Sequence, residues 1–255
     1  MAPATATDIL VYSVREWDGE FFSRDVPGGV ETSPVRSALW LMNSDGSGRT
    51  RLASPCTRAE HPVASPNGRW IYWQTESAGC WRICRMHPDG SGRSHIAPTA
   101  GMDDGNASAF GTALSMDGQW LIYTLHDGGM GRVLRARADG TEAQLIAPDF
   151  GYTYMASPDA NAGRVVLSGP ACEYRLLLVT TPDVHPQVLT PNHRDSYVPR
   201  FTPDGGAVIF IRRDGGLYRM SPDGSEIRQL ADEVQVECFL SPQDAHGSTD
   251  VPAIS

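Results

Sequence analysis

The chain has 255 residues, and its 21 Lys and Arg against 30 Asp and Glu leave a formal net charge of −9. This length suits one domain rather than two, and the acidic balance argues against binding to nucleic acids or anionic membranes, which depends on basic patches. No segment approaches the ~18 consecutive apolar residues of a membrane span. The first eight residues lack the basic and apolar stretches of a signal peptide, so we expect a cytoplasmic protein.

The first expected strand is 8–12, Asp-Ile-Leu-Val-Tyr, and two more are expected at 38–42 and 49–52. These runs are rich in apolar and β-branched residues and are bounded by turn residues, which is the pattern of short strands. A 24-residue loop, 14–37, separates the first two and contains Trp17. This loop predicts either a lid over a binding pocket or a surface excursion that packs its own aromatic residues on the protein.

An Asp-Gly turn phrase recurs from residue 42 onwards. Met42-Asn-Ser-Asp-Gly-Ser-Gly48 returns as Met86-His-Pro-Asp-Gly-Ser-Gly92, Ala136-Arg-Ala-Asp-Gly-Thr141 and Met220-Ser-Pro-Asp-Gly-Ser225, with a degenerate copy at Thr181-Pro-Asp183. The Asp residues of these phrases follow one another at steps of 44, 50, 44 and 40 residues. Self-similarity at such a period indicates a propeller or another array of repeated units.

A second phrase recurs out of phase with the first. Its copies are Ser65-Pro-Asn-Gly68, Ser115-Met-Asp-Gly118, Ser157-Pro-Asp159, Thr202-Pro-Asp-Gly205 and Ser241-Pro-Gln-Asp244, and short apolar runs follow the first four. Each unit therefore predicts four strands: A before the Ser-Pro turn, B after it, C before the Asp-Gly turn and D after that. No segment shows sustained helical periodicity, so we expect an all-β protein built of propeller blades.

The number of copies predicts five blades within a single domain, 1–255. Residues 235–240 form a strand A with no strand B after it, and 8–12 form a strand B with no strand A before it. We therefore expect the C-terminal strand to complete the first blade and to remove exposed sheet edges. The alternative is a fragment of a six- or seven-bladed protein. The expected blades are 7–55 with 233–242, then 58–98, 104–148, 150–190 and 193–231.

The two phrases together resemble the propeller repeats of TolB-type proteins, and the resemblance covers nearly the whole chain. It implies a β-propeller. It leaves the function open, because such repeats occur in periplasmic scaffold proteins, in peptidase-associated propellers and, more distantly, in oligogalacturonate-lyase-type enzymes. The chain has no Gly-x-Ser-x-Gly nucleophile elbow of the hydrolase relatives. Its seven histidines form no tight cluster like that of the lyase relatives.

The five cysteines, 56, 80, 84, 172 and 238, are an odd number. Cys80 and Cys84 lack a second pair at metal-ligand spacing, so we expect free thiols rather than a zinc site. Asp103-Asp104 could hold a cation or be a solvated pair. We expect neither a bound metal nor a cofactor.

Loop lengths point to one face of the propeller as the site. The A–B and C–D turns, which form the turn face, are short and interchangeable. The B–C and D–A loops, which form the opposite loop face, are irregular, and loops on a rigid scaffold often carry function. Expected ligand-binding residues at the axial mouth on the loop face are Trp17, Arg58, Glu60, Tyr152, Asp195, Tyr197, Arg200 and Glu237. They would form a funnel for a polar ligand, or simply line a water-filled channel.

Two functions remain open at this point. The first is a binding propeller for a small molecule, a glycan or a peptide. The second is a lyase- or cyclase-type enzyme without a covalent nucleophile, in which Arg58 or Arg200 would hold a carboxylate. The acid–base candidates for such chemistry are His61, His126, His193 and Tyr154.

Overall fold

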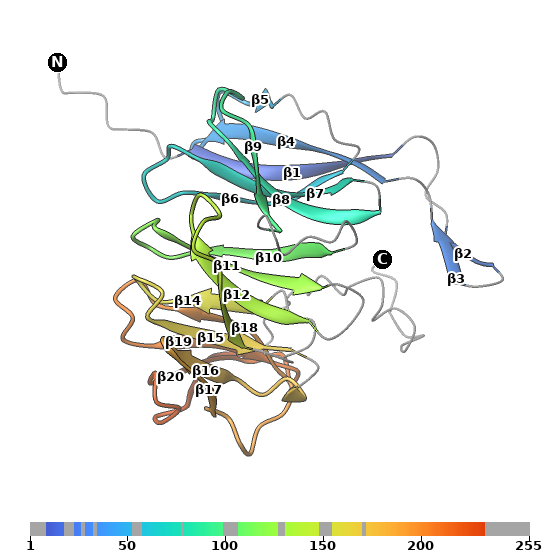
Figure 1. Cartoon of the computed structure of the whole chain (residues 1–255). Helices are drawn as coiled ribbons and strands as arrows, with labels where there is room; N and C mark the ends of the chain where they lie inside the picture. The colour runs from blue at the N-terminus through green and yellow to red at the C-terminus, as the bar shows by residue number, and fades with distance from the viewer. Residues whose placement is uncertain are drawn as a thin grey trace.

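A computed structural model describes residues 9–17, 23–26, 29–32, 35–52, 58–77, 79–98, 107–126, 131–147, 155–169 and 172–232. The elements of these residues are β-strands, and they form a five-bladed β-propeller (Figure 1). The expected all-β class and blade number are confirmed. The described residues contain no helix that is long and apolar enough to cross a membrane.

Four blades are antiparallel sheets whose four strands lie side by side in chain order. Blade 2 contains β6 (Ala59–Ala64), β7 (Ile71–Ser77), β8 (Cys80–Met86) and β9 (Ser94–Ala97). Blade 3 contains β10 (Ser108–Leu114), β11 (Trp120–His126), β12 (Arg132–Arg137) and β13 (Gln144–Ala147). Blade 4 contains β14 (Met155–Pro158), β15 (Arg164–Ser168), β16 (Leu177–Thr180) and β17 (Asp183–Val188). Blade 5 contains β18 (Ser196–Phe201), β19 (Val208–Arg212), β20 (Leu217–Met220) and β21 (Arg228–Ala231).

Blade 1 has three described strands, β1 (Ile9–Trp17), β4 (Val35–Asn43) and β5 (Thr50–Arg51), in the order β1-β4-β5. The segment 235–240, which we expect to be its inner strand, lies outside the described residues. The long loop between β1 and β4 contains a separate hairpin, β2 (Ser23–Val26) and β3 (Gly29–Thr32). Figure 1 shows this hairpin standing away from the blades.

The Asp-Gly phrases form the turns between the third and fourth strands of the blades. In blade 1, Asp45 Oδ1 accepts hydrogen bonds from the backbone N–H and the hydroxyl of Ser47 at 2.9 and 2.7 Å, and Gly46 follows at a φ of 85°. These bonds stabilise the carboxylate and lower the pKa of Asp45. The same bonds recur in the turns at 89–91, 139–141 and 223–225. The repeated phrase therefore forms the same hydrogen-bonded turn in each of these blades, which makes the turn face uniform.

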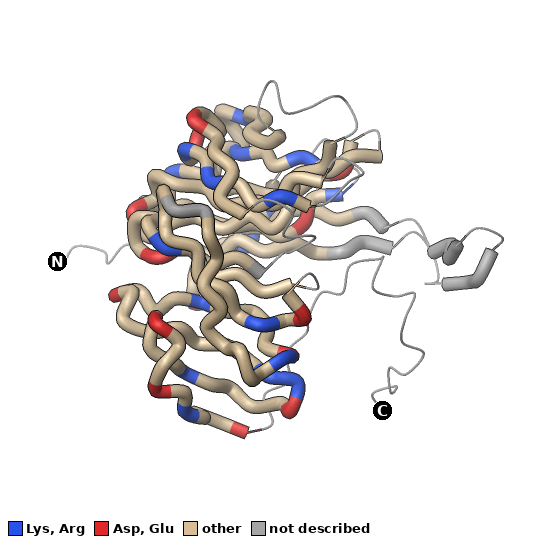
Figure 2. Tube along the Cα trace, turned by 60° about the horizontal axis from the view of Figure 1, so that its bottom comes forward, with Lys and Arg blue, Asp and Glu red and all other residues tan. Residues whose placement is uncertain are grey.

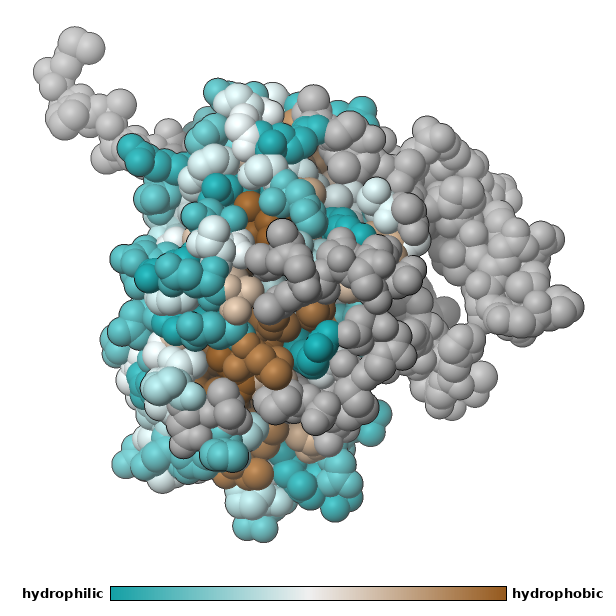
Figure 3. Space-filling model, viewed as in Figure 1, coloured by the Kyte–Doolittle hydropathy of each residue, from teal (hydrophilic) through white to brown (hydrophobic). Residues whose placement is uncertain are grey.

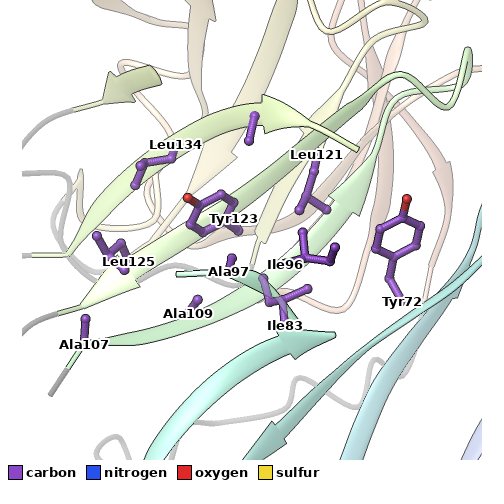
Figure 4. Packing of buried hydrophobic residues seen from close by; sticks show 11 residues of the cluster. Tyr72, Ile83, Ile96, Ala97, Ala107, Ala109, Leu121, Tyr123, Leu125 and Leu134 are labelled. Atoms are coloured by element: carbon purple, nitrogen blue, oxygen red, sulfur yellow. The ribbon is translucent and has the colours of Figure 1, made fainter. Parts of the chain in front are cut away.

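The apolar core is divided into clusters, one at each boundary between consecutive blades from blade 1 to blade 5. Between blades 2 and 3, for example, Ile83 and Ile96 pack against Leu121 and Leu134 (Figure 4). The equivalent clusters fill the boundaries between blades 1 and 2, 3 and 4, and 4 and 5. Figure 3 shows polar side chains over the turns at the left and apolar side chains reaching the surface between the blades.

Candidate functional site

The innermost strands of three blades share a β-bulge near the axis. The pairing register shifts after Glu60 in β6, after Phe110 in β10 and after Tyr197 in β18. The next residue has a positive φ in each case: 50° at His61, 72° at Gly111 and 50° at Val198. Because glycine and valine occupy the same position in other blades, the backbone of His61 serves the bulge geometry that is common to these blades.

A cluster of polar and aromatic residues lies on the loop face where blades 4 and 5 meet. The turn that connects β15 to β16 contributes Glu173 and Tyr174, and the connection from β17 to β18 contributes Asp195. The two segments are joined because the Ser196 backbone N–H donates to the Tyr174 carbonyl at 2.8 Å. We call Glu173, Tyr174, Asp195, Tyr197 and Arg213 the mouth cluster.

The backbone of the mouth cluster is strained. Glu173, Tyr174 and Asp195 have φ values of 52°, 55° and 64°. Non-glycine residues in this left-handed region cost on the order of 1–3 kcal/mol each and persist where their surroundings hold them. Among the described residues, Glu173 and Tyr174 are the one pair of consecutive non-glycine residues in this conformation. Such strain concentrates at ligand sites, which marks this part of the loop face as the best candidate.

Asp195 and Tyr197 form the centre of the cluster. The Tyr197 hydroxyl donates a hydrogen bond to Asp195 Oδ1 at 3.0 Å, and the rings of Tyr174 and Tyr197 lie 4.7 Å apart at 41°. Burial, together with the hydrogen bond and the charge of Asp195, raises the pKa of Tyr197 well above its usual value. Tyr197 therefore stays protonated near neutral pH and acts as a hydrogen-bond donor beside an aromatic wall.

Three guanidinium groups pair with the carboxylates of the mouth cluster. Glu173 Oε2 lies 2.7 Å from Arg175 Nη2 and 3.2 Å from Arg194 Nε. Arg213 Nη1 lies 3.8 Å from Asp195 Oδ1, and the Arg213 side chain is 77% exposed. Exposed ion pairs contribute little free energy. The outer cations can therefore exchange these carboxylates for a ligand group at small cost.

Arg58 and Glu60 form a second polar network, on blade 2. Arg58 Nη2 lies 3.1 Å from Glu60 Oε1, and Arg58 Nη1 lies 3.0 Å from Glu76 Oε2. The Arg58 guanidinium also lies 4.6 Å from the centre of a Trp81 ring. These two expected ligand-binding residues are thus brought together as an ion pair, and their part in ligand binding stays a prediction.

Arg200 is a cation on the inner strand β18. Its Nη1 donates to the Pro199 carbonyl at 3.0 Å and lies 3.5 Å from the carbonyl of Ala156 on the neighbouring inner strand. The residue is exposed to solvent, yet burial by surrounding protein lowers the pKa of its guanidinium. Both observations fit a side chain that is enclosed by protein but reached by water.

The three candidate histidines lie on different parts of the propeller. His61 is on β6, His126 is the last residue of β11, and His193 lies in the connection to β18, where its backbone N–H donates to the Thr190 carbonyl at 3.2 Å. No three His, Cys, Asp or Glu residues among those described are placed to hold a metal ion. Outside the described residues lie Tyr152, Tyr154, Glu237 and the Asp103-Asp104 pair, and the side chain of Trp17 is not described either.

Glu173, Tyr174 and Arg213 are not among the site residues expected from the sequence. The irregular segment 169–175, which departs from the repeat between strands B and C of blade 4, is the signal that could have drawn attention to the first two. Figure 2 shows acidic and basic residues interspersed over the described chain rather than gathered into a basic surface.

No protein-family model and no curated protein sequence matches the chain. Several solved structures share its fold. TolB from Acinetobacter baumannii matches with a TM-score of 0.60 and 19% identity over 78% of this chain and 49% of TolB, so the chain spans about half the length of that protein. A putative TolB from Agrobacterium tumefaciens matches with a TM-score of 0.62 and 12% identity over 86% of this chain and 80% of the other.

An oligogalacturonate lyase in complex with manganese also matches, with a TM-score of 0.50 and 16% identity over 66% of this chain and 50% of the lyase. Identities this low establish the fold alone. The expected resemblance is confirmed at that level: the chain has the fold of TolB-like β-propellers.

Proposed function

We propose that the chain is a ligand-binding propeller whose site is the mouth cluster on the loop face. The observation that carries this proposal is that Glu173 and Tyr174, two non-glycine residues with positive φ, belong to one cluster with Asp195. Asp195 is a third residue in that conformation, and it accepts the hydrogen bond of Tyr197. The cluster offers two carboxylates, two phenol rings with their hydroxyls and the exposed guanidinium group of Arg213. These groups suit a small polar ligand, a glycan or a peptide end that presents both hydroxyl and anionic groups.

The lyase or cyclase alternative receives less support from the same residues. A proton-abstracting base works best when its pKa lies near the working pH. The raised pKa of Tyr197 makes this phenol a poor base at neutral pH. His61 and His126, two further acid–base candidates, lie on blades 2 and 3, away from the mouth cluster on blades 4 and 5.

The test is a binding screen by thermal shift, with neutral and acidic oligosaccharides, dicarboxylates and short peptides as probes, followed by titration calorimetry of any probe that binds. Tyr197→Phe should weaken binding of a positive probe by about 10-fold, because the variant loses the hydroxyl that donates to Asp195 and whose oxygen can accept a hydrogen bond from the ligand. Tyr218→Phe is the matched control, since the Tyr218 hydroxyl donates to Asp214 at 2.9 Å in the same way but Tyr218 packs in the core between blades 4 and 5.

Equal affinities in wild type and Tyr197→Phe, for a probe that wild type binds, would place the site elsewhere. Turnover of a probe that survives in Tyr197→Phe but is lost in His126→Ala or His193→Ala would favour the enzyme alternative instead.

A further inference from the structure

The side chains beside the turns of the turn face differ from blade to blade, although the turns themselves are alike. In blade 3 the first residue of β11, Trp120, stands opposite Arg137 of β12. Arg135 lies two residues before Arg137 and therefore on the same face of the sheet. This face is turned towards blade 4, because Trp120 packs against the apolar cluster between blades 3 and 4.

Two guanidinium groups lie against the indole of Trp120. The Cζ atom of Arg135 lies 3.4 Å from the centre of a Trp120 ring, and the Cζ atom of Arg137 lies 4.1 Å from one. A guanidinium group that stacks on an aromatic ring uses its flat face, so the N–H groups along its edge stay available for hydrogen bonds. The stack also orients the group, which lowers the entropy lost when an anion binds.

Blade 2 has a similar arrangement with one guanidinium group instead of two. Its Trp70 lies 4.2 Å from the Cζ atom of Arg85 on one side and is stacked on the ring of His87 at 3.9 Å. Arg85 Nη1 donates a hydrogen bond to the Ala138 carbonyl of blade 3 at 3.1 Å, and the Tyr72 hydroxyl donates to the same carbonyl at 2.8 Å. Arg85 therefore helps to hold blades 2 and 3 together.

Arg135 makes no equivalent bond to blade 4. It has the register position of Arg85, but Thr181 of blade 4 stands where blade 3 has Ala138. Among the residues that the structure describes, none accepts a hydrogen bond from the buried Nε of Arg135, and no carboxylate lies within ion-pair distance of its guanidinium group. A half-buried cation without an acceptor is stabilised by any anion that reaches it.

Two carboxylates lie near enough for their charges to act on Arg135, but both have other partners. Asp117 accepts hydrogen bonds within its own turn, at 2.6 Å from the Ser115 hydroxyl. Asp159 Oδ2 lies 2.9 Å from Arg164 Nε, and the Asp159 side chain is only 10% exposed. Neither carboxylate neutralises Arg135 directly.

Arg137 places a second positive charge beside the first. Burial, and after it the repulsion by Arg137, lowers the pKa of Arg135. Arg137 is paired through its Nε with Glu142 Oε2 at 3.0 Å, and both of these side chains are exposed. Such a pair contributes little free energy, so Glu142 can be displaced at small cost. An anion between the two guanidinium groups would offset both the burial and the repulsion.

This double arginine distinguishes blade 3 from the other blades whose four strands are described. The residues at the two positions are Arg85 and His87 in blade 2, Leu178 and Thr180 in blade 4, and Arg219 and Ser221 in blade 5. The turn face is thus uniform in its backbone turns but not in the side chains beside them.

We propose that Arg135, Arg137 and Trp120 form a binding site for a phosphate group, on the turn face at the boundary between blades 3 and 4. A phosphate group carries about two negative charges near neutral pH, which match the two guanidinium groups. A carboxylate would match only one of them. The site goes beyond the proposed function, because the mouth cluster lies on the opposite face of blades 4 and 5.

The net charge of −9 does not exclude this site. At physiological ionic strength, charges more than about 8 Å apart are largely screened from one another. The local balance therefore decides whether an anion binds, and at Trp120 that balance is positive.

The first experiment is an NMR titration of the full chain with sodium phosphate at constant ionic strength, followed at the indole N–H signal of Trp120. The signal is assigned by its absence in Trp120→Phe. We expect a saturable shift with a Kd on the order of 1 mM. Acetate should bind at least about 10-fold more weakly. An unchanged Trp120 signal, or equal affinities for phosphate and acetate, would overturn the proposal.

The second experiment repeats the titration with arginine variants. Arg135→Gln should weaken phosphate binding by about 10-fold or more, because charge-assisted hydrogen bonds are lost. Arg135→Lys should restore only part of the affinity, since an ammonium group lacks the planar fork. Arg219→Gln is the matched control and should change the affinity by less than about 2-fold, because Arg219 has the same register position in blade 5 without the tryptophan or the second arginine. Equal effects of Arg135→Gln and Arg219→Gln would contradict the proposal.

A further pair of variants protects this test against misfolding and against binding elsewhere. Arg137→Gln changes an exposed side chain, so it should leave the fold intact and still weaken phosphate binding. Arg213→Gln alters the mouth cluster and should leave the shift of the Trp120 signal unchanged. Loss of that shift in Arg213→Gln, or its persistence in Arg137→Gln at unchanged affinity, would overturn the proposal.

The source of the phosphate group is tested with phosphoserine and glucose 6-phosphate in place of inorganic phosphate. Tighter binding of one ester would identify a phosphorylated protein or a sugar phosphate as the source, and equal affinities would identify inorganic phosphate itself. In each case Arg135→Gln must weaken the binding. A phosphate ester that binds equally well to wild type and to Arg135→Gln would place its site elsewhere and refute the assignment.

Discussion

Gly140 of blade 3 lies against Ile96 of blade 2 so closely that a Cβ atom on Gly140 would come within 2.6 Å of the Ile96 carbonyl oxygen. Gly224 of blade 5 has the same relationship to the Leu189 carbonyl of blade 4, also at 2.6 Å. At these two turns the glycine of the Asp-Gly phrase has a double function. It adopts a positive φ, and it lets one blade approach the backbone of the previous one.

Gly140→Ala should therefore cost more stability than the same change in a turn that touches no neighbour. Gly90 is the matched control, because its φ of 85° is close to the 89° of Gly140 but an added Cβ would meet nothing within 4 Å. The left-handed conformation costs about 1–2 kcal/mol in both variants. Overpacking should add about 1–3 kcal/mol to the loss at Gly140. Chemical denaturation measures both, and equal losses would contradict the interpretation.

Arg58→Ala should destabilise the protein although no ligand is involved. The Glu60 side chain is almost completely buried, and the loss of Arg58 would leave its carboxylate without this cation. Removing one partner of a buried ion pair costs about 3–5 kcal/mol, and the partial exposure of Arg58 places the expected loss nearer 2 kcal/mol. Arg137→Ala breaks the exposed pair with Glu142 and should change stability by less than about 1 kcal/mol. Urea denaturation of both variants checks the contrast.

Tyr197 should make stability decline at alkaline pH. Its pKa is higher in the folded protein than in the unfolded chain. The stabilisation that this difference supplies is therefore fully present below the unfolded value of about 10 and is lost as the pH rises above it. Tyr197→Phe should lose less stability than wild type between about pH 10 and pH 11.5. Unfolding free energies across this range test the prediction, and parallel curves for the two proteins would refute it.

Thiol chemistry provides a further check. Cys80, Cys84 and Cys172 are free thiols in the structure. Titration of the denatured, non-reduced chain should find all five of its cysteines as thiols. In the native protein Cys172 should be among the slowest to react, because burial raises its pKa and its Sγ lies 3.1 Å from the carbonyl oxygens of both Gly169 and Arg175, to either of which the thiol can donate. A count of three or fewer would indicate a disulfide.

The turn residues at fixed spacing, together with the apolar runs between them, were sufficient to predict the blades. Asp, Gly and Ser at fixed spacing determine a turn through bonds between residues two apart, and Asp45 and Ser47 make the same bonds whatever surrounds them. The apolar runs between the turns determine the strands in the same local way. The all-β class, the number of blades and the uniform turn face follow from such short-range interactions, which can be read along the chain.

The mouth cluster could not be predicted in full because its parts come from different blades. Asp195 and Tyr197 were expected as ligand-binding residues, but Tyr174 is more than 20 residues away, and its ring meets Tyr197 only when blades 4 and 5 pack together. The strain at Glu173, Tyr174 and Asp195 is likewise imposed by surrounding contacts, since none of them is a glycine that would favour a positive φ by itself.

The sequence by itself therefore determined the repeating architecture and the difference between the uniform turn face and the irregular loop face, because both depend on interactions within a single repeat. The tertiary structure alone decided that Arg58 and Glu60 neutralise one another and that Tyr197 donates to Asp195 beside Tyr174. It also decided that Leu10 and Leu230 are exposed where their counterparts are buried. Burial and side-chain partners depend on how whole blades pack, so equivalent repeat positions can differ in burial from one blade to another.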